Sequence, residues 1–213
     1  MVQVISLVQQ KGGSGKSTLL AGLASLLALD GLKVVIVDTD PQQTIYKWAS
    51  KDKADVDYLF EDDDAKLVPT VKKLKQDYDV IFIDTAGFAS VMTMYAINVA
   101  NLVLIPSKAS EPDAQGALRT YQHVQNVCES ADKNIQAYIV MNDVDRMARI
   151  TNAVKEAFDS NNVPRLDAVL WSRTGLKEMI SEGGAPKGAA LSAMREVLAD
   201  LQIKNALEYG RVG

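Results

Sequence analysis

Eight consecutive residues near the start of the chain have the composition of a phosphate-binding loop. They read Lys11-Gly12-Gly13-Ser14-Gly15-Lys16-Ser17-Thr18 and lie between a β-branched run and an apolar, helix-forming stretch. Glycines let the backbone wrap a polyphosphate with its N–H groups pointing inward, and the helix N-terminus adds a partial positive charge. Lys16 is placed to reach the β- and γ-phosphate oxygens, and the Ser17 hydroxyl to bind Mg²⁺. The loop therefore predicts a nucleotide site with a magnesium ion.

Two acidic motifs follow, each at the end of an apolar run. The first is Asp38-Thr39-Asp40-Pro41-Gln42, and the second is Val80-Ile81-Phe82-Ile83-Asp84-Thr85-Ala86-Gly87. Carboxylates at the carboxyl ends of parallel strands lie where open α/β sheets bind ligands. The Asp-Pro pair alone is also a common turn former, and an apolar strand can end in Asp for no functional reason. The order of the three motifs together is what favours a metal-nucleotide site.

The glycine loop departs from the ordinary pattern G-x-x-x-x-G-K-[ST], because Gln10 occupies the first glycine position. Its form, K-G-G-x-G-K-S, resembles the deviant Walker A motif of the ParA/MinD superfamily of ATPases. The resemblance implies that Lys11 crosses a dimer interface to the partner's nucleotide, and that Lys11, Lys16 and Asp38 are catalytic. It also implies Mg²⁺ ligation, directly or through water, by Ser17, Asp38 and Asp84. The division of roles between Asp38 and Asp40 stays open.

The resemblance continues more loosely in the second half of the chain. Pro106, Asp113 and the helix-forming stretch after them are similar to a family segment, although Asp113 can be simply the N-cap of that helix. Asn142 follows a later strand, and the resemblance implies that its amide pairs with adenine; an ordinary loop asparagine is the alternative. Arg173 matches the family's arginine after a late strand. The nucleotide ligands expected are therefore Lys11–Thr18 and Asn142, and the expected cofactors are ATP and Mg²⁺.

The elements that must position these residues alternate between short β-branched runs and amphipathic stretches, which is typical of βαβ units with a parallel sheet. The fold class expected is α/β, a doubly wound, mostly parallel sheet flanked by helices, in one P-loop domain over residues 1–213. Strands are expected at Val2–Val8, Lys33–Val37, Val80–Ile83, Leu102–Ile105, Gln136–Met141 and Ala168–Leu170. Helices are expected at Lys16–Leu29, Ala65–Gln76, Ala114–Ser130, Arg149–Ser160, Gly175–Ser181 and Ala189–Leu207, with weaker patterns at Thr44–Ser50 and Ser90–Val99.

Composition restricts the function classes. The 213 residues are 47% apolar and 23% charged, close to globular averages, and the net charge is −4. A chain that coats nucleic acid through overall positive charge is thereby excluded, so any DNA contact is a local patch. The single cysteine, Cys128, excludes an internal disulfide and a multi-cysteine cluster within one chain. With no secretory signal pattern at the N-terminus and no long apolar run, a cytoplasmic protein is expected.

The resemblance is strongest to small ParA-like partition ATPases that lack the N-terminal helix-turn-helix domain of larger relatives. It implies a homodimer that forms on ATP binding and associates with nucleoid DNA without sequence preference. A partner protein, bound to DNA or another cargo, would stimulate slow hydrolysis. The expected DNA contacts are Arg173, Arg195, Arg146 and Arg149.

Two alternatives share the same scaffold. One is a nucleotide-gated adaptor that recruits a DNA-processing complex, such as a relaxosome. The other is a MinD-like membrane cycle, which requires a basic amphipathic terminal helix. The polar face of Leu191–Gly213 mixes basic and acidic residues, so this stretch is expected to dock on the protein body without stable membrane association.

Overall fold

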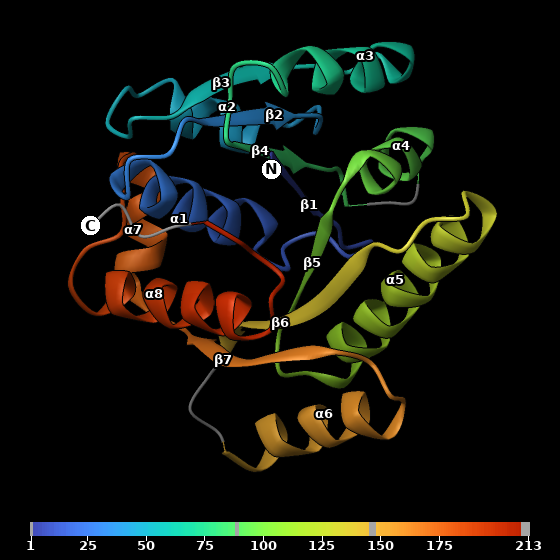
Figure 1. Cartoon of the computed structure of the whole chain (residues 1–213). Coiled ribbons are helices and arrows are strands. Elements are labelled where there is room, and N and C mark those ends of the chain that lie inside the picture. The colour runs from blue at the N-terminus through green and yellow to red at the C-terminus, as the bar shows by residue number, and fades with distance from the viewer. Residues whose placement is uncertain (1, 88–89, 145–147, 210–213) are drawn as a thin grey trace.

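The computed structural model describes residues 2–87, 90–144 and 148–209. Over these residues, seven strands form one parallel sheet with helices on both faces (Figure 1), which confirms the expected fold class. The strands are β1 (Gln3–Leu7), β2 (Val34–Asp38), β3 (Asp57–Phe60), β4 (Val80–Asp84), β5 (Leu102–Ser107), β6 (Gln136–Val144) and β7 (Arg165–Trp171). Of these, β3 was not expected from the sequence.

The helices lie close to the expected positions. They are α1 (Lys16–Leu29), α2 (Thr44–Ala49), α3 (Asp64–Leu74), α4 (Val91–Val99), α5 (Glu111–Ser130), α6 (Ala148–Ser160), α7 (Thr174–Glu182) and α8 (Gly188–Ile203). Both weaker helical patterns, α2 and α4, are thus confirmed. The largest differences are an earlier start of α5 and an earlier end of α8.

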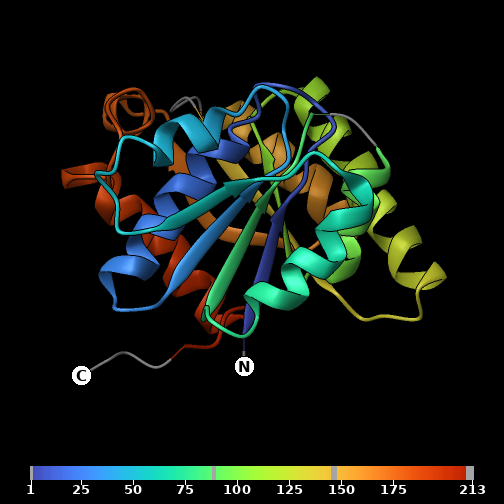
Figure 2. The ribbon, with the colours of Figure 1, turned by 90° about the horizontal axis from the view of Figure 1, so that it is seen from above.

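The strand order β3-β2-β4-β1-β5-β6-β7 explains where the site lies. From β1 the chain goes outward to β2 and β3, returns to β4, and then crosses to β5 on the other side of β1. Loops that leave β1 and its neighbours therefore diverge at the carboxyl edge, which is where such sheets bind ligands. Figure 2 shows β1 running from the side marked N toward the opposite edge, where the loop that follows it lies.

Alternating side chains divide the core between the two faces of the sheet, as expected for strands covered on both sides. Ile5, Leu7 and Ile36 pack against α1, α2, α7 and α8. Val4 and Val35 point the other way, toward α3 and α4. The same opposite layer continues under α5 and α6. Both faces are thus buried, so only the two edges lined by strand ends carry loops.

Helix α8 docks on the body, as its mixed charge predicted. Its residues Met194, Val197 and Leu201 are fully buried. Asp200 on the same helix accepts hydrogen bonds from the backbone N–H groups of Asp167 (2.5 Å) and Ala168 (2.9 Å) of the edge strand β7. The helix therefore covers part of that strand's free backbone, which otherwise invites pairing with another chain.

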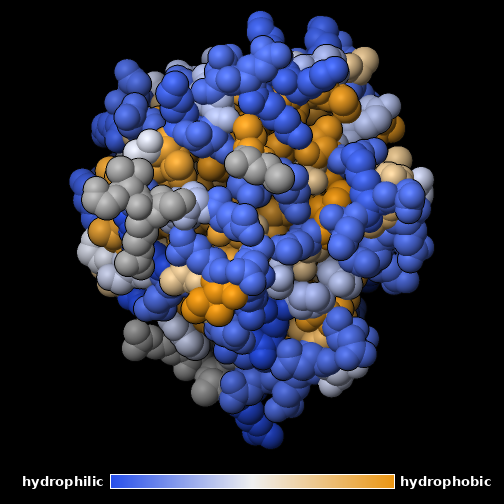
Figure 3. Space-filling view, viewed as in Figure 1, coloured by the Kyte–Doolittle hydropathy of each residue, from blue (hydrophilic) through white to orange (hydrophobic). Residues whose placement is uncertain are grey.

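The side at which the strands begin faces the viewer in Figures 1 and 3. Hydrophilic side chains cover most of this face, and apolar side chains are visible in the hollows between them (Figure 3). Within the described part of the chain, no helix combines the length and the apolar character needed to span a membrane.

Candidate nucleotide-binding site

The glycine loop connects β1 to α1 and requires glycine at two positions. Gly13 and Gly15 have φ angles of 74° and 91°, in the left-handed region that other residues rarely adopt. Gly15 is also the N-cap of α1, and a Cβ there would lie only 2.0 Å from Nδ2 of Asn142. The loop can take this shape only with glycine at position 15.

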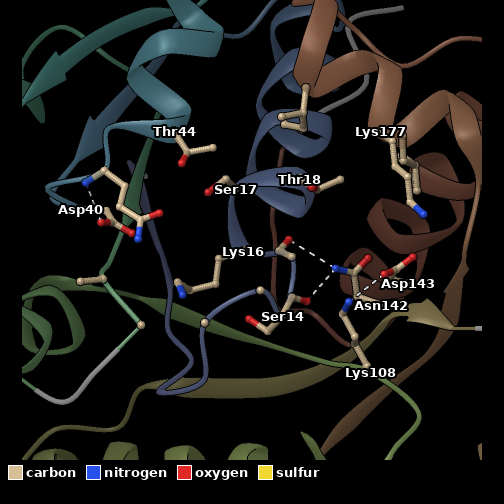
Figure 4. Close-up of a pocket in the computed structure, with 18 of the residues that line it drawn as sticks. Ser14, Lys16, Ser17, Thr18, Asp40, Thr44, Lys108, Asn142, Asp143 and Lys177 are labelled. Atoms are coloured by element: carbon tan, nitrogen blue, oxygen red, sulfur yellow. Dashed lines mark hydrogen bonds and ion pairs between the residues drawn. The ribbon is translucent and has the colours of Figure 1, made fainter.

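Asn142 holds the loop from the other side of the pocket. Its Nδ2 donates to the carbonyl oxygens of Ser14 (3.0 Å) and Gly15 (3.3 Å), as the dashed lines in Figure 4 show. The side chain is almost fully buried. Because Nδ2 is already used, only Oδ1 is left as a partner for a base, so the adenine contact stays a prediction.

Lys16 begins α1 and lies among the loop residues it is expected to serve. It is nearly buried, and its Nζ lies 3.4 Å from the carbonyl oxygen of Gln9. Burial lowers the pKa of this lysine, and the carboxylates of Asp84 and Asp40 oppose the shift. An ammonium held in this way gains from a polyanionic ligand, since phosphate oxygens would replace the water it has lost.

Ser17 and Asp84 form the pair expected to hold a metal ion. The Ser17 hydroxyl donates to Asp84 Oδ2 at 2.8 Å, while Asp84 Oδ1 is buried with no hydrogen-bond partner among the described residues. Burial, and then repulsion from Asp38, raise the pKa of Asp84 to about 7. A hydrated magnesium ion beside this carboxylate would satisfy the free oxygen and favour its ionised form.

Asp38 and Asp84 are direct neighbours across β2 and β4, yet their surroundings differ. Asp38 accepts backbone hydrogen bonds from Asp40 (3.0 Å) and Tyr46 (2.9 Å), so both of its oxygens hold the loop that leads into α2. Burial raises the pKa of Asp38 against these hydrogen bonds. Asp40, by contrast, lines the pocket (Figure 4). Asp38 and Asp40, whose division of roles the sequence left open, therefore differ in their access to a ligand.

Gly87 links the second acidic motif to the glycine loop. A Cβ at this position would lie 3.2 Å from both the Cα and the N of Gly12. The segment after β4 thus packs directly on the loop, where a bound γ-phosphate would meet both.

A pocket of about 550 Å³ opens between these elements. Figure 4 shows Asp40 and Thr44 on one side of it, Asn142, Asp143, Lys108 and Lys177 on the other, and Lys16, Ser17 and Thr18 between. The volume suits a ligand of nucleotide size. The structure thus brings together the expected residues Gly12–Thr18, Asp40 and Asn142 in its lining.

Three charged lining residues were not predicted from the sequence: Lys108, Asp143 and Lys177. Lys108 Nζ and Asp143 Oδ2 form an ion pair of 2.9 Å, and Asp143 has a φ of 52°. Burial opposes ionisation of Asp143, but hydrogen bonds from Lys108 and Ser172 lower its pKa overall. Lys108 follows β5 and Asp143 lies near the end of β6, so their positions at the carboxyl ends of strands could have predicted them as pocket residues. Nothing in the sequence marks Lys177.

Lys11 does not join the pocket. Its Nζ forms an ion pair of 2.9 Å with Asp113 Oδ2 on α5. Asp113 is also not the N-cap of α5, which corrects that alternative: Ser110 is the N-cap and accepts from the backbone N–H of Asp113. Because Glu111 and Pro112 already belong to the first turn, Asp113 lies inside the helix.

Of the described arginines expected to contact DNA, Arg195 lies apart from Arg173. Arg173 lines the nucleotide pocket, and its Nε is buried without a hydrogen-bond partner among the described residues. Arg195 pairs with Asp30 at 2.5 Å, beyond the end of α1 that lies away from the loop. Arg149 is exposed near the start of α6, and Arg146 lies outside the described residues. Their DNA contacts stay a prediction.

Taken together, the site fits a nucleoside triphosphate with magnesium. Five buried side-chain polar atoms lack protein partners in the described chain. Three of them, Ser14 Oγ, Asp84 Oδ1 and Arg173 Nε, belong to residues of the loop, the metal pair or the pocket lining, and the other two are Trp48 Nε1 and His123 Nε2. A buried polar atom left unpaired costs free energy, so such atoms mark where a ligand or water belongs. With the parallel sheet, this site defines a P-loop ATPase of the ParA/MinD superfamily.

The chain belongs to the VirC1 protein family, whose model matches residues 2–208. The protein ParA of Rhizobium radiobacter is 29% identical over 185 residues, which cover 85% of this chain and 83% of that protein. The protein virC1 of the same organism is 25% identical over 190 residues, with 85% and 82% covered. The expected superfamily is thereby confirmed.

Solved structures show the same fold at low identity. A plasmid partition protein of Borrelia burgdorferi B31 bound to AMPPNP has a TM-score of 0.75 at 18% identity, with 96% of this chain and 100% of that chain covered. The septum site-determining protein MinD of Pyrococcus horikoshii, complexed with Mg-ADP, has a TM-score of 0.73 at 20% identity, with 98% and 100% covered.

Proposed function

We propose that this chain is a Mg²⁺-dependent ATPase whose ATP-bound form is a two-fold homodimer. The dimer binds DNA without sequence preference and positions a DNA or other cargo together with a partner protein that stimulates hydrolysis. The observation that carries the proposal is the surplus lysine: Lys16 already serves the phosphate loop, whereas Lys11 lies outside the pocket lining, with its side chain 45% exposed. A lysine directed away from its own site is available to a neighbouring copy.

Each protomer would bind ATP with the backbone N–H groups of Gly12–Ser17 around the phosphates and Lys16 on their outer oxygens. Ser17 and Asp84 would hold the magnesium ion, which when bound neutralises charge that develops between the β- and γ-phosphates. Asp38 or Asp40 would orient the attacking water. Asn142 would keep the loop in shape and leave Oδ1 for the base.

The proposed DNA contact depends on basic residues at the surface of the dimer. The chain has a net charge of −4, so a monomer should bind DNA weakly, but a two-fold dimer doubles every basic patch. Arg149 is the best placed of the described candidates, because Arg173 faces the nucleotide pocket and Arg195 is paired. Binding is expected in the cytoplasm, on nucleoid DNA.

The test is to measure the mass of the protein by light scattering with ADP and with a non-hydrolysable ATP analogue, and then to titrate DNA binding with salt. The proposal predicts a dimer only with the ATP analogue, and equal affinity of that dimer for unrelated duplexes. Arg149→Ala should reduce the slope of log K against log salt by roughly 0.9 for each phosphate that is no longer neutralised. An unchanged mass with the analogue would contradict the proposal.

A second function, a nucleotide-gated adaptor for a DNA-processing complex, is favoured by the places of two of the candidate arginines. Arg173 lines the nucleotide pocket and Arg195 is paired with Asp30, so neither arrangement requires DNA. An adaptor would dimerise with ATP but bind no DNA at low salt. The same titration therefore separates the two functions.

A further inference from the structure

We propose that Asp113 on α5 is a positioning residue that holds Lys11 within its own protomer until a nucleotide-bound dimer forms. The inference rests on the proposed function, because it assumes that Lys11 acts on the nucleotide of the partner subunit. It adds that Lys11 is bound to Asp113 in the monomer, and that the free energy needed to break this contact affects the dissociation constant of the dimer.

The ion pair joins an accessible lysine to an almost buried carboxylate. Lys11 Nζ lies 2.9 Å from Asp113 Oδ2, and the two side chains are 45% and 8% exposed. Asp113 is also hydrogen-bonded to the Ser110 hydroxyl. Burial opposes ionisation of Asp113, but the hydrogen bond from Ser110 and the contact with Lys11 outweigh it and lower its pKa. The carboxylate is therefore fixed in place and charged.

The backbone of Lys11 is held by the same helix. Its N–H donates to Gln9 Oε1 at 3.3 Å, and Gln9 Oε1 also accepts from the Thr120 hydroxyl of α5 at 3.0 Å. A Cβ added to Gly116, between Asp113 and Thr120, would lie 3.8 Å from Lys11 Cβ. The start of the glycine loop thus lies along two turns of α5, with the lysine extended toward Asp113.

This arrangement makes the contact reversible. Asp113 lies in the first turn of α5, where the helix dipole stabilises a negative charge, so the carboxylate remains favourable after the lysine leaves. The exposed lysine has little to lose except the ion pair itself. Phosphate oxygens of a partner's nucleotide offer a stronger charged hydrogen bond. When the dimer forms, Lys11 thus exchanges its ion pair with Asp113 for a contact with phosphate. Because the ion pair must first be broken, it disfavours the dimer unless the partner holds a nucleotide.

The resting contact is tested directly on the nucleotide-free protein by measuring how fast Lys11 is acetylated, with peptide mass spectrometry and exposed Lys72 as the internal reference. Lys11 should react several-fold faster in Asp113→Asn than in the wild type, and Asp113→Glu should restore slow reaction. Ser110→Ala, which removes the cap but not the ion pair, is the matched control and should stay slow. Equal rates in the wild type and Asp113→Asn would overturn the proposal.

The consequence is tested by measuring the dimer dissociation constant with a non-hydrolysable ATP analogue. An exposed or partly buried ion pair contributes up to ~1 kcal/mol, and the two-fold dimer gives up one such pair in each protomer, so Asp113→Asn should tighten the dimer by up to about thirtyfold. An unchanged or weaker dimer would overturn the proposal. If the wild type stays monomeric with the analogue, the proposed function and the gating of the dimer both fail, and the acetylation rates alone decide whether Asp113 holds Lys11.

Discussion

At the residue scale, two neighbouring buried carboxylates use their oxygens differently. Asp38 has both oxygens occupied by backbone N–H groups, while Asp84 has one oxygen on Ser17 and one without a partner in the described chain. A buried carboxylate is costly unless it is fully hydrogen-bonded or bound to a cation. Asp38 therefore holds the backbone, whereas Asp84 keeps one oxygen available for the magnesium ion that we propose there.

The first prediction concerns the pH dependence of stability without nucleotide and magnesium. Burial raises the pKa of Asp84 to about 7 from its ordinary value of 3.8. The folded state thus binds the proton more tightly than the unfolded state, so this group's contribution to stability is greatest below pH 4 and is lost as the pH rises to about 7. Asp84→Asn should therefore raise the free energy of unfolding at pH 8 by up to roughly 4 kcal/mol.

Urea unfolding in EDTA measures this effect. The difference between Asp84→Asn and the wild type should shrink toward zero near pH 4, while the variant should lose magnesium-dependent nucleotide binding at every pH. Equal stability of the two proteins at pH 8 would show that burial does not raise the pKa of Asp84.

The second prediction separates the roles of Asp38 and Asp40. Asp38→Ala should both slow ATP turnover and lower the free energy of unfolding by about 1–3 kcal/mol, because it leaves two backbone N–H groups without their acceptor. Asp40, unlike Asp38, lines the pocket and is more accessible, so Asp40→Ala should slow turnover with little loss of stability. Steady-state hydrolysis and urea unfolding of both variants give the answer. A fully active Asp38→Ala would remove that residue from the catalytic site.

At the element scale, α1 carries the phosphate loop at its start and packs on α8 along its length. The close approach occurs at Gly22, where a Cβ would lie 2.5 Å from Met194 Cε and 2.7 Å from its Sδ. Helix propensity favours alanine over glycine by about 1 kcal/mol, but here the added methyl group must displace a methionine. Packing against α8 therefore explains a glycine inside a helix that otherwise favours larger residues.

The third prediction is a coupling between these two positions. Gly22→Ala should be nearly neutral in the wild type, because propensity and overpacking offset each other. In a Met194→Ala background the same change should stabilise the protein by about 1 kcal/mol, because the clash is gone. A double-mutant cycle by urea unfolding measures this difference, and identical effects in both backgrounds would contradict the close packing of the helices.

The sequence predicted most elements because β-branched runs and apolar helices alternate without interruption. It missed β3, whose four residues begin with Asp57 and pair with β2 only, so that neither length nor hydrophobicity marks this edge strand. It placed the start of α5 three residues late, although Ser110 and Pro112 are a capping signal. Cap chemistry was therefore more informative here than apolar periodicity.

For the site, the motifs predicted the residues that are consecutive in sequence, namely the loop and the acids at two strand ends. They did not predict Lys108, Asp143 and Lys177, because the pocket gathers these from three separate segments. They also gave no indication that Lys11 meets Asp113, since about a hundred residues separate the two. Contacts of that kind depend on strand order, which local patterns do not determine.

At the scale of the whole molecule, the carboxyl ends and the amino ends of the strands carry different groups of residues. The carboxyl edge gathers the loop, both acidic motifs and the dock for Lys11, whereas Arg195 and Asp30 lie toward the opposite edge. A partner protomer that completes the nucleotide site must therefore approach the carboxyl edge. The opposite edge would remain exposed in such a dimer.

Action of Lys11 across a dimer interface is tested most directly by mixing two inactive variants. Asp38→Ala and Lys11→Ala should each bind ATP with little or no hydrolysis. In a mixed dimer, Lys11 of the Asp38→Ala protomer would reach the nucleotide held by the other protomer, whose Asp38 is intact. An equal mixture should then recover up to about a quarter of the wild-type rate of hydrolysis, because half of random dimers contain one complete site. A mixture as inactive as either variant alone would contradict an action of Lys11 on the partner's nucleotide.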